Sequence, residues 1–183
     1  MKKLLWLYFF LFAGMFFCFG GIAQADIEPE MVEKLLADDG AANDDFGLSV
    51  SVSGDTSVIG ALGDDDNGSS SGSAYVFTRT YTGWTQAAKL TPDDGAAYDS
   101  FGSSVSVSGD IAVIGAFGDG DNGSSSGSAY VFTRTDTGWT QAAKLTPDDG
   151  AADDYFGSSV SVSGDIAVIG APNANEYPGS AYV

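Results

Sequence analysis

The sequence predicts an all-β protein, a β-propeller of four-stranded antiparallel blades, of which about three are present. Three observations lead to this prediction. The chain repeats itself every 55 residues, and within each repeat short apolar runs alternate with Gly, Ser, Asp and Thr, which is typical of strands and turns. No window after the N-terminal segment has the apolar period of about 3.6 residues that marks a helix.

The repeat is nearly perfect. Residues 46–100 and 101–155 differ at 8 positions, so 55 minus 8 leaves 47 identities. A third copy starts at residue 156, and its first sixteen residues repeat 101–116 without change. In such an array each unit is expected to bury its apolar faces against its neighbours.

Four strands are predicted in the copy that spans residues 101–155. Residues 104–108 alternate polar and apolar, which indicates a half-buried strand, and residues 111–116 are almost all apolar, which predicts a strand buried on both faces. Aromatic and small residues alternate over 128–134, and the more polar stretch 139–145 is the expected outer strand. Four strands suit a propeller blade, whereas a β-sandwich needs about seven.

The predicted organisation begins before the first full copy. Residues 31–36 lie in the register of the outer strand, so a lone outer strand is expected there. The expected parts are a signal peptide at 1–25, a lead-in with the lone outer strand at 26–45, blades at 46–100 and 101–155, and a truncated blade at 156–183. Three blades are fewer than the four to eight that close a ring, which leaves an open arc or a fragment of a larger propeller, with self-association through the unpaired blades.

The N-terminal segment has the layout of a secretory signal. Lys2 and Lys3 precede a long apolar run, and Ala23-Gln24-Ala25 supplies small residues for cleavage after Ala25. This predicts a secreted, periplasmic or cell-surface protein with no membrane span after cleavage. An uncleaved anchor is the alternative, because the apolar run is almost long enough to cross a bilayer.

Composition excludes several kinds of chemistry. Cys18 is the only cysteine, it lies in the signal, and the chain has no histidine, which excludes Ser-His-Asp and Cys-His catalysis and the usual zinc sites. Beyond residue 25 there are five basic and 25 acidic residues, so the net charge is 5 minus 25, or −20. This charge argues against nucleic acid as a partner and favours cations or basic ligands.

Each copy opens with Phe-Gly and reaches Gly-Ala thirteen residues later. The motif residues are Phe46, Gly47, Gly60 and Ala61; Phe101, Gly102, Gly115 and Ala116; and Phe156, Gly157, Gly170 and Ala171, followed by Pro172. The pattern resembles the FG-GAP repeat, the blade unit of the integrin α-subunit propeller and of many secreted bacterial proteins. The phenylalanine can fill the gap between adjacent blades, and the glycines allow sharp turns and close backbone contact.

The resemblance also implies a calcium loop of the form DxDxDG between the first two strands of a blade, and here the chain departs from the pattern. Only Ser-Gly-Asp separates those strands in each copy, which leaves no room for the ligands. Acidic residues lie instead in the loops between the second and third strands. A weak calcium site is expected there from Asp64 and Asp66 and from Asp119 and Asp121, the latter pair with Asn122 or backbone carbonyls; solvated turn residues are the alternative.

The up-and-down order of the strands places these loops and the acidic inter-repeat loops on one face. The FG-GAP resemblance implies an extracellular or cell-surface module that binds a protein or glycan ligand there, or mediates adhesion, and is not an enzyme. A structural spacer and a glycan-acting enzyme that uses carboxylates are the alternatives. Copies that agree at 47 of 55 positions argue against the enzyme, because a single active site needs residues that differ between blades.

Overall fold

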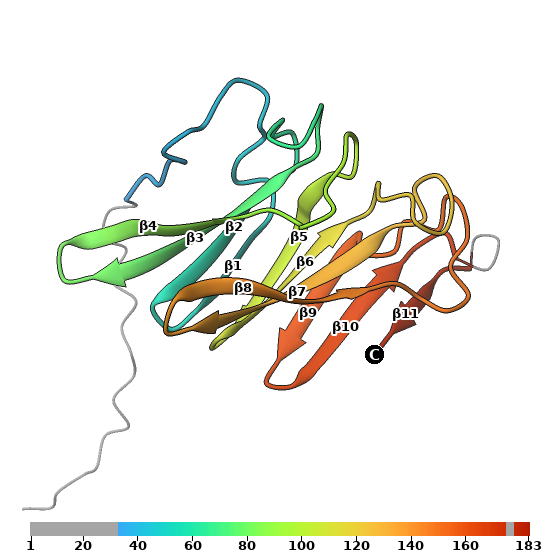
Figure 1. Ribbon diagram of the computed structural model, residues 1–183. Helices are drawn as coiled ribbons and strands as arrows, with labels where there is room; N and C mark the ends of the chain where they lie inside the picture. Colours follow the sequence, from blue (N-terminus) through green and yellow to red (C-terminus); the bar gives the residue numbers. More distant parts are fainter. Residues whose placement is uncertain (1–32, 175–177) are drawn as a thin grey trace, which may run out of the picture. The chain divides into compact units, whose positions relative to one another are not determined.

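The computed structural model describes residues 33–174 and 178–183, and Glu33–Val183 form one compact unit. Its strands make three antiparallel sheets, each coloured as one stretch of the chain in Figure 1. Sheet 1 has the order β1-β2-β3-β4, with β1 at Val50–Ser53, β2 at Thr56–Ala61, β3 at Ser73–Thr80 and β4 at Gly83–Leu90. Sheet 2 has the order β5-β6-β7-β8, with β5 at Phe101–Ser108, β6 at Ile111–Ala116, β7 at Ser128–Thr135 and β8 at Gly138–Leu145. Sheet 3 has the order β11-β10-β9, with β9 at Ser159–Ser163, β10 at Ile166–Ala171 and β11 at Ser180–Tyr182.

The all-β fold and its blade-like sheets are therefore confirmed, as three up-and-down sheets that do not close into a ring. The predicted strands of the second copy match β5 to β8 to within one residue at every end except the start of β5. β5 begins at Phe101 rather than Ser104, because a bulge between these residues carries the pairing with β6 back to Ala116. Bulges bend a strand locally, and this one brings the Phe-Gly motif into the sheet.

Short turns join the first two strands of each sheet. Ser53 pairs with Thr56 across a two-residue turn led by Gly54, whose φ is 58°, a conformation that glycine adopts without a Cβ penalty. The same turn recurs at Gly109 and Gly164, with φ of 58° and 59°. The repeated Ser-Gly-Asp sequence thus specifies a tight hairpin and leaves no loop there.

Two layers of apolar side chains lie between neighbouring sheets. Val58 and Val76 of sheet 1 share a buried cluster with Phe101, Val105 and Val107 of sheet 2. The equivalent cluster joins sheets 2 and 3. Its members include Val113, Ala129, Phe156, Ile169 and Ala171. Sheet 2 therefore contributes both of its faces to the core, as expected of a repeat whose units bury their apolar faces against one another.

Two of the motif phenylalanines, Phe101 and Phe156, lie in these layers, whereas Phe46 packs in a cluster of sheet 1 and the lead-in. Phe101 is fully buried and meets Tyr130 and Phe132 edge-on, with ring centroids 5.4 and 6.0 Å apart. Phe46 and Phe156 make the same contacts in their own sheets, with Tyr75 and Tyr182. Edge-to-face packing of this kind supports the gap-filling role inferred from the sequence.

The structure departs from one sequence-based expectation at the N-terminal end of the described residues. Residues 33–36 of the expected lone outer strand do not pair with any described strand. They lie against sheet 1, where Leu35 packs on the cluster that includes Tyr75 and the Glu33 carboxylate accepts a hydrogen bond from Trp84 N of β4 at 3.3 Å. β10, the counterpart of β6 in the third copy, is half exposed because no described sheet covers its outer side. The predicted signal peptide lies outside the described residues. Among those described, no helix is long and apolar enough to span a membrane.

Candidate functional site

The loops between β2 and β3 and between β6 and β7 lie at the same end of the sheets as the inter-repeat loops. Backbone hydrogen bonds join them: Tyr98 N donates to Ser69 O at 2.7 Å and Phe101 N to Ser71 O at 3.0 Å. The inter-repeat loop also accepts a bond from the next sheet, because Gly118 N donates to Asp99 O at 3.1 Å. The acidic loops thus form one continuous surface, which we call the acidic loop face.

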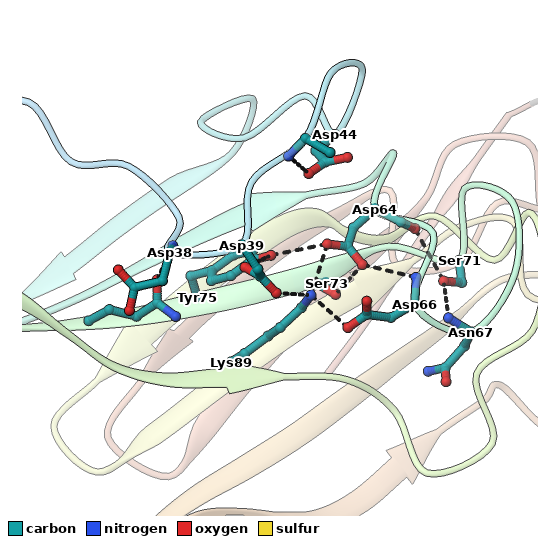
Figure 2. Close-up of polar contacts among 12 residues, drawn as sticks. Asp38, Asp39, Asp44, Asp64, Asp66, Asn67, Ser71, Ser73, Tyr75 and Lys89 are labelled. Carbon is teal, nitrogen blue, oxygen red and sulfur yellow. Dashed lines mark hydrogen bonds and ion pairs between the residues drawn. The ribbon is translucent and has the colours of Figure 1, made fainter.

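A lysine lies at the centre of the first acidic cluster on this face (Figure 2). Lys89, from β4, places its Nζ 2.7 Å from Asp39 Oδ2, 3.0 Å from Asp64 Oδ2 and 2.6 Å from Asp66 Oδ2. Asp39 comes from the lead-in before β1, whereas Asp64 and Asp66 belong to the loop between β2 and β3. One ammonium therefore ties three segments of chain together.

Neighbouring hydroxyl and amide groups hold the buried carboxylate of this cluster in place. The Tyr75 hydroxyl, on β3 directly opposite Lys89, lies 3.0 Å from an oxygen of both Asp39 and Asp64. Ser73 Oγ and the backbone amide of Asp66 donate to Asp64 Oδ1 at 3.0 and 3.1 Å. Asp64 is only 4% exposed, so these bonds replace the water that its carboxylate has lost.

The second repeat builds the same cluster. Lys144 Nζ lies 2.7 Å from Asp94, 2.9 Å from Asp119 and 2.6 Å from Asp121, and the Tyr130 hydroxyl lies 3.0 Å from both Asp94 and Asp119. Asp119 is 3% exposed. One bond differs, because the buried hydroxyl of Ser128, the equivalent of Ser73, has no partner among the described residues.

The described residues of the third repeat do not form the cluster. Ala174 stands where Asp64 and Asp119 stand in the first two repeats, although the Tyr182 hydroxyl still donates to Asp149 Oδ1 at 3.0 Å. The two lysine-centred clusters, Asp39-Asp64-Asp66-Lys89 and Asp94-Asp119-Asp121-Lys144, are called the lysine clusters below.

Burial and pairing change the acidity of these groups. Hydrogen bonds from Lys89 hold the pKa of Asp39 below its ordinary range. Burial raises the pKa of Asp64, but bonds from Lys89, the Asp66 amide and Tyr75 outweigh it and leave that pKa lowered. Burial alone would lower the pKa of Lys89, yet its three carboxylate partners raise it above its ordinary range. Asp39, Asp64 and Lys89 are therefore ionised near neutral pH.

Stability is expected to depend on pH in a way that follows from these directions. The pKa values of Asp39, Asp64 and Asp94 are lowered from 3.8, so their contribution is present above pH 3.8 and is lost as the pH falls below it. The pKa values of Lys89 and Lys144 are raised from 10.5, so the contribution of these lysines to stability is present below pH 10.5 and is lost as the pH rises above it.

Urea unfolding at a series of pH values checks this expectation. The urea concentration at the midpoint of unfolding should be constant from about pH 5 to 9 and should fall below and above that range. Burial raises the pKa of Asp99, so the effect of this residue on stability at low pH is opposite to that of Asp39, Asp64 and Asp94. It is one group against three, so the net effect remains a loss of stability in acid. A midpoint that stayed constant from pH 9 to pH 12 would contradict the role given to the two lysines.

The structure brings the four sequence-predicted acids into these clusters, two in each. Asp64 lies with Asp66, and Asp119 lies with Asp121. Asn122, the further ligand considered from sequence, instead donates its backbone amide to Ser126 Oγ. The solvated-turn alternative does not describe Asp64 and Asp119, which are buried.

Sequence reasoning missed the third carboxylate and the cation of each cluster. Asp39 and Asp94 come from the preceding inter-repeat loop, and Lys89 and Lys144 come from the outer strands. A signal was present, because each lysine falls at the same repeat position and pairs directly with the tyrosine of the neighbouring strand.

The opposite end of the sheets is built differently. There Arg79 pairs with Asp55 of the β1–β2 turn at 2.6 Å, and Arg134 pairs with Asp110 of the β5–β6 turn. All four side chains are largely exposed, so each pair is worth at most about 1 kcal/mol. The acidic character of the molecule is therefore concentrated at the loop face.

The oxygen atoms of each carboxylate triad lie within 4.8 Å of one another, so each triad can hold a metal ion such as calcium. In the structure the position between them is taken by the lysine ammonium. A metal ion would have to displace this ammonium. With one oxygen from each carboxylate and one hydroxyl, the site supplies four ligand atoms, fewer than the six to eight that calcium prefers.

The family of the chain follows from its repeats. The FG-GAP repeat profile matches residues 30–77, 84–132 and 139–183. The chain belongs to the FG-GAP repeat family. Each FG-GAP match runs from the outer strand of one sheet, or from the lead-in, through the first three strands of the next sheet. A search of curated proteins found no match to the chain.

Proposed function

We propose that this FG-GAP protein is an extracellular or cell-surface module that binds a ligand or mediates adhesion through its acidic loop face, with no catalysis of its own. The observation that carries the proposal is the distribution of charge on that face. Its exposed carboxylates include Asp38, Asp45, Asp65, Asp93, Asp148, Asp149 and Asp153. Lys89 and Lys144, by contrast, are paired with carboxylates inside the lysine clusters, so the side chains that this face exposes to solvent are mainly acidic.

The lysine clusters also support binding, because they fix the loops that carry these acids. Each cluster ties an inter-repeat segment to the loop between the second and third strands through contacts of 2.6 to 3.0 Å. Loops that are ordered before binding lose less entropy when a ligand arrives. A rigid negative face suits a protein or glycan ligand that carries positive groups, and its field speeds their encounter.

Export is part of the same proposal and rests on the sequence of residues 1–25, which has the layout of a secretory signal. The absence of histidine and of any cysteine beyond Cys18 suits a binding role better than nucleophilic catalysis. The near identity of the first two repeats supports the same reading, because it places equivalent surfaces side by side.

A charge-matched pair of variants tests the location of the binding face. Asp93→Asn with Asp148→Asn removes two charges from the acidic loop face, and Asp136→Asn with Asp165→Asn removes two from the opposite end; all four residues are exposed. Binding to an immobilised lysine decapeptide and to a glycan array is measured by surface plasmon resonance and fluorescence. The loop-face variant is expected to lose about tenfold in affinity, because two attractive charges are gone.

The opposite-end variant should bind as the unchanged protein does. Equal losses in the two variants would show that net charge, rather than this face, controls binding. No binding of any probe by the unchanged protein would favour the spacer alternative.

A further inference from the structure

Sheet 1 has one face that no described sheet covers. Val50 and Val52 of β1 are each 66% exposed, and Leu48 beside them is 65% exposed. Their equivalents in sheet 2, Val105 and Val107, are 8% and 6% exposed because sheet 1 packs on them. We call this uncovered side of sheet 1 the leading face.

Sheet 3 has the opposite face uncovered. Val168 of β10 is 39% exposed and Ile166 is 57% exposed, whereas Val58 and Val113, the equivalents of Val168, are fully buried against the next sheet. We call this side of sheet 3 the trailing face. The leading and trailing faces are thus the two halves of the interface that the molecule already forms twice.

A repeated set of hydrogen bonds defines that interface. Between sheets 1 and 2, Val107 N donates to Ser51 Oγ and Gly109 N donates to Ser53 Oγ, each at 3.1 Å. Between sheets 2 and 3 the same bonds join Val162 N to Ser106 Oγ and Gly164 N to Ser108 Oγ, at 3.0 and 3.1 Å. One repeat further along, Ser161 and Ser163 stand on the trailing face, and Val52 and Gly54 occupy the donor positions on the leading face.

Close backbone contact at the motif glycines shows the same pattern. A Cβ on Gly60 would lie 1.9 Å from Gly102 O, and one on Gly115 would lie 1.9 Å from Gly157 O. At Gly170 on the trailing face a Cβ would meet only groups of its own sheet, and at Gly47 on the leading face it would meet nothing within 4 Å. Gly170 and Gly47 are therefore the unmatched halves of a third glycine contact.

The trailing face also has a hollow where a Phe-Gly motif would enter. It has a volume of about 520 Å³, and its lining includes Ser159, Gly170, Ala171 and Gly179. In the preceding repeats, the equivalents of Gly179 are Gly72 and Gly127, which bridge to Phe101 and Phe156 of the next sheet.

We propose that the trailing face of one molecule binds the leading face of a second copy, head to tail, with Phe46 and Gly47 of the second copy entering the hollow. The occupant is a second copy because the two faces reproduce an interface already present, residue for residue. The segment at 33–36 completes the fit. Leu35 is the repeat equivalent of Leu145, which pairs with Ala129 of β7, so this segment would add the missing outer strand beside Ala181 of β11.

Head-to-tail contacts are heterologous and can close into rings. Two copies of the residues that the structure describes bring two times three, or six, sheets, which is within the four to eight blades that close a propeller. A closed dimer would cover both faces of both copies, and we expect the protein to form one.

Complementation between two face variants tests this arrangement. The full chain is expressed with its own N-terminal segment. Its molar mass is measured by sedimentation velocity at 1 to 100 µM, a range of about two decades that covers the dissociation constants of weak dimers. Val52→Glu alters only the leading face and Val168→Glu only the trailing face. Tyr81→Glu, in the exposed β3–β4 turn, is the matched control.

The unchanged protein and the Tyr81→Glu variant are expected to be dimers, and each face variant alone should be a monomer. An equimolar mixture of the two face variants should regain a dimer, because one copy keeps an intact trailing face and the other an intact leading face. Thermal unfolding of each variant checks that it remains folded. A monomeric unchanged protein, a mixture that stays monomeric, or face variants that still associate would each overturn the proposal.

Discussion

Replacing Lys144 with methionine is expected to lower the free energy of unfolding by about 3 kcal/mol, since removing one partner of a buried ion pair leaves uncompensated charge. Three carboxylates would lose their common cation, and Asp119 is only 3% exposed. Methionine keeps most of the aliphatic length, so the loss reports on the ammonium. Urea unfolding of the purified variant gives the value.

Lys34→Met is the matched control, because Lys34 falls at the same repeat position but is exposed. It should change stability by less than about 0.5 kcal/mol, as most surface substitutions do.

Millimolar calcium should raise the melting temperature of Lys144→Met, whose triad is open to a metal ion, and should leave the unchanged protein unaffected because the ammonium occupies that position. Equal stability of Lys144→Met and the unchanged protein would contradict the structural role of the lysine cluster.

Gly115→Ala is expected to cost about 3 kcal/mol or more, at the upper end of overpacking effects. The new Cβ would lie 1.9 Å from the carbonyl oxygen of Gly157, a backbone atom of the next sheet, so relief would require the two sheets to separate. The layer between sheets 2 and 3, including Val113 and Phe156, would loosen with them. Denaturant unfolding measures the loss, and the yield of folded protein reports on it if the variant is too unstable to unfold reversibly.

Gly170→Ala provides the comparison at the same motif position. There the Cβ would meet only Ser159 Oγ at 2.4 Å, a side-chain atom that can rotate away, so a cost below about 1 kcal/mol is expected at dilutions where the chain is monomeric. Comparing the two variants shows whether glycine is needed at this position for geometry within its own sheet or for close contact with the next sheet. Equal costs at both positions would mean that glycine is needed within its own sheet rather than for contact between sheets.

Much of the fold could be predicted from the residues because its determinants are local and repeated. The alternation in 104–108, the apolar run 111–116 and the Ser-Gly-Asp turn between them each specify backbone geometry over a few residues, and three copies in phase removed the ambiguity of any one. The lone strand expected at 31–36 shows the limit of this reasoning. The segment has the right register, but a strand also needs a partner for its backbone hydrogen bonds, and no described strand pairs with residues 33–36.

The candidate site was only half predictable, for a physical reason. Asp64 and Asp66 lie in one loop, so composition alone pointed to them, whereas Asp39 and Lys89 are 25 residues or more from Asp64 along the chain. What joins them is the pairing of β3 with β4 and the return of the inter-repeat loop to the same end of the sheet. The lysine within each acidic cluster changes its interpretation, because the position between the carboxylates already holds an ammonium of the protein itself.

The sequence by itself therefore determined the repeat, its strands and turns, the family motif and the acidic character of one end, because each depends on neighbours in the chain. The tertiary structure decided which groups meet there: it placed Lys89 and Lys144 among the carboxylates, buried Asp64 and Asp119, and left Val52 and Val168 exposed on two complementary faces. Charge neutralisation and burial depend on contacts between strands and sheets, and these exist only once the chain has folded.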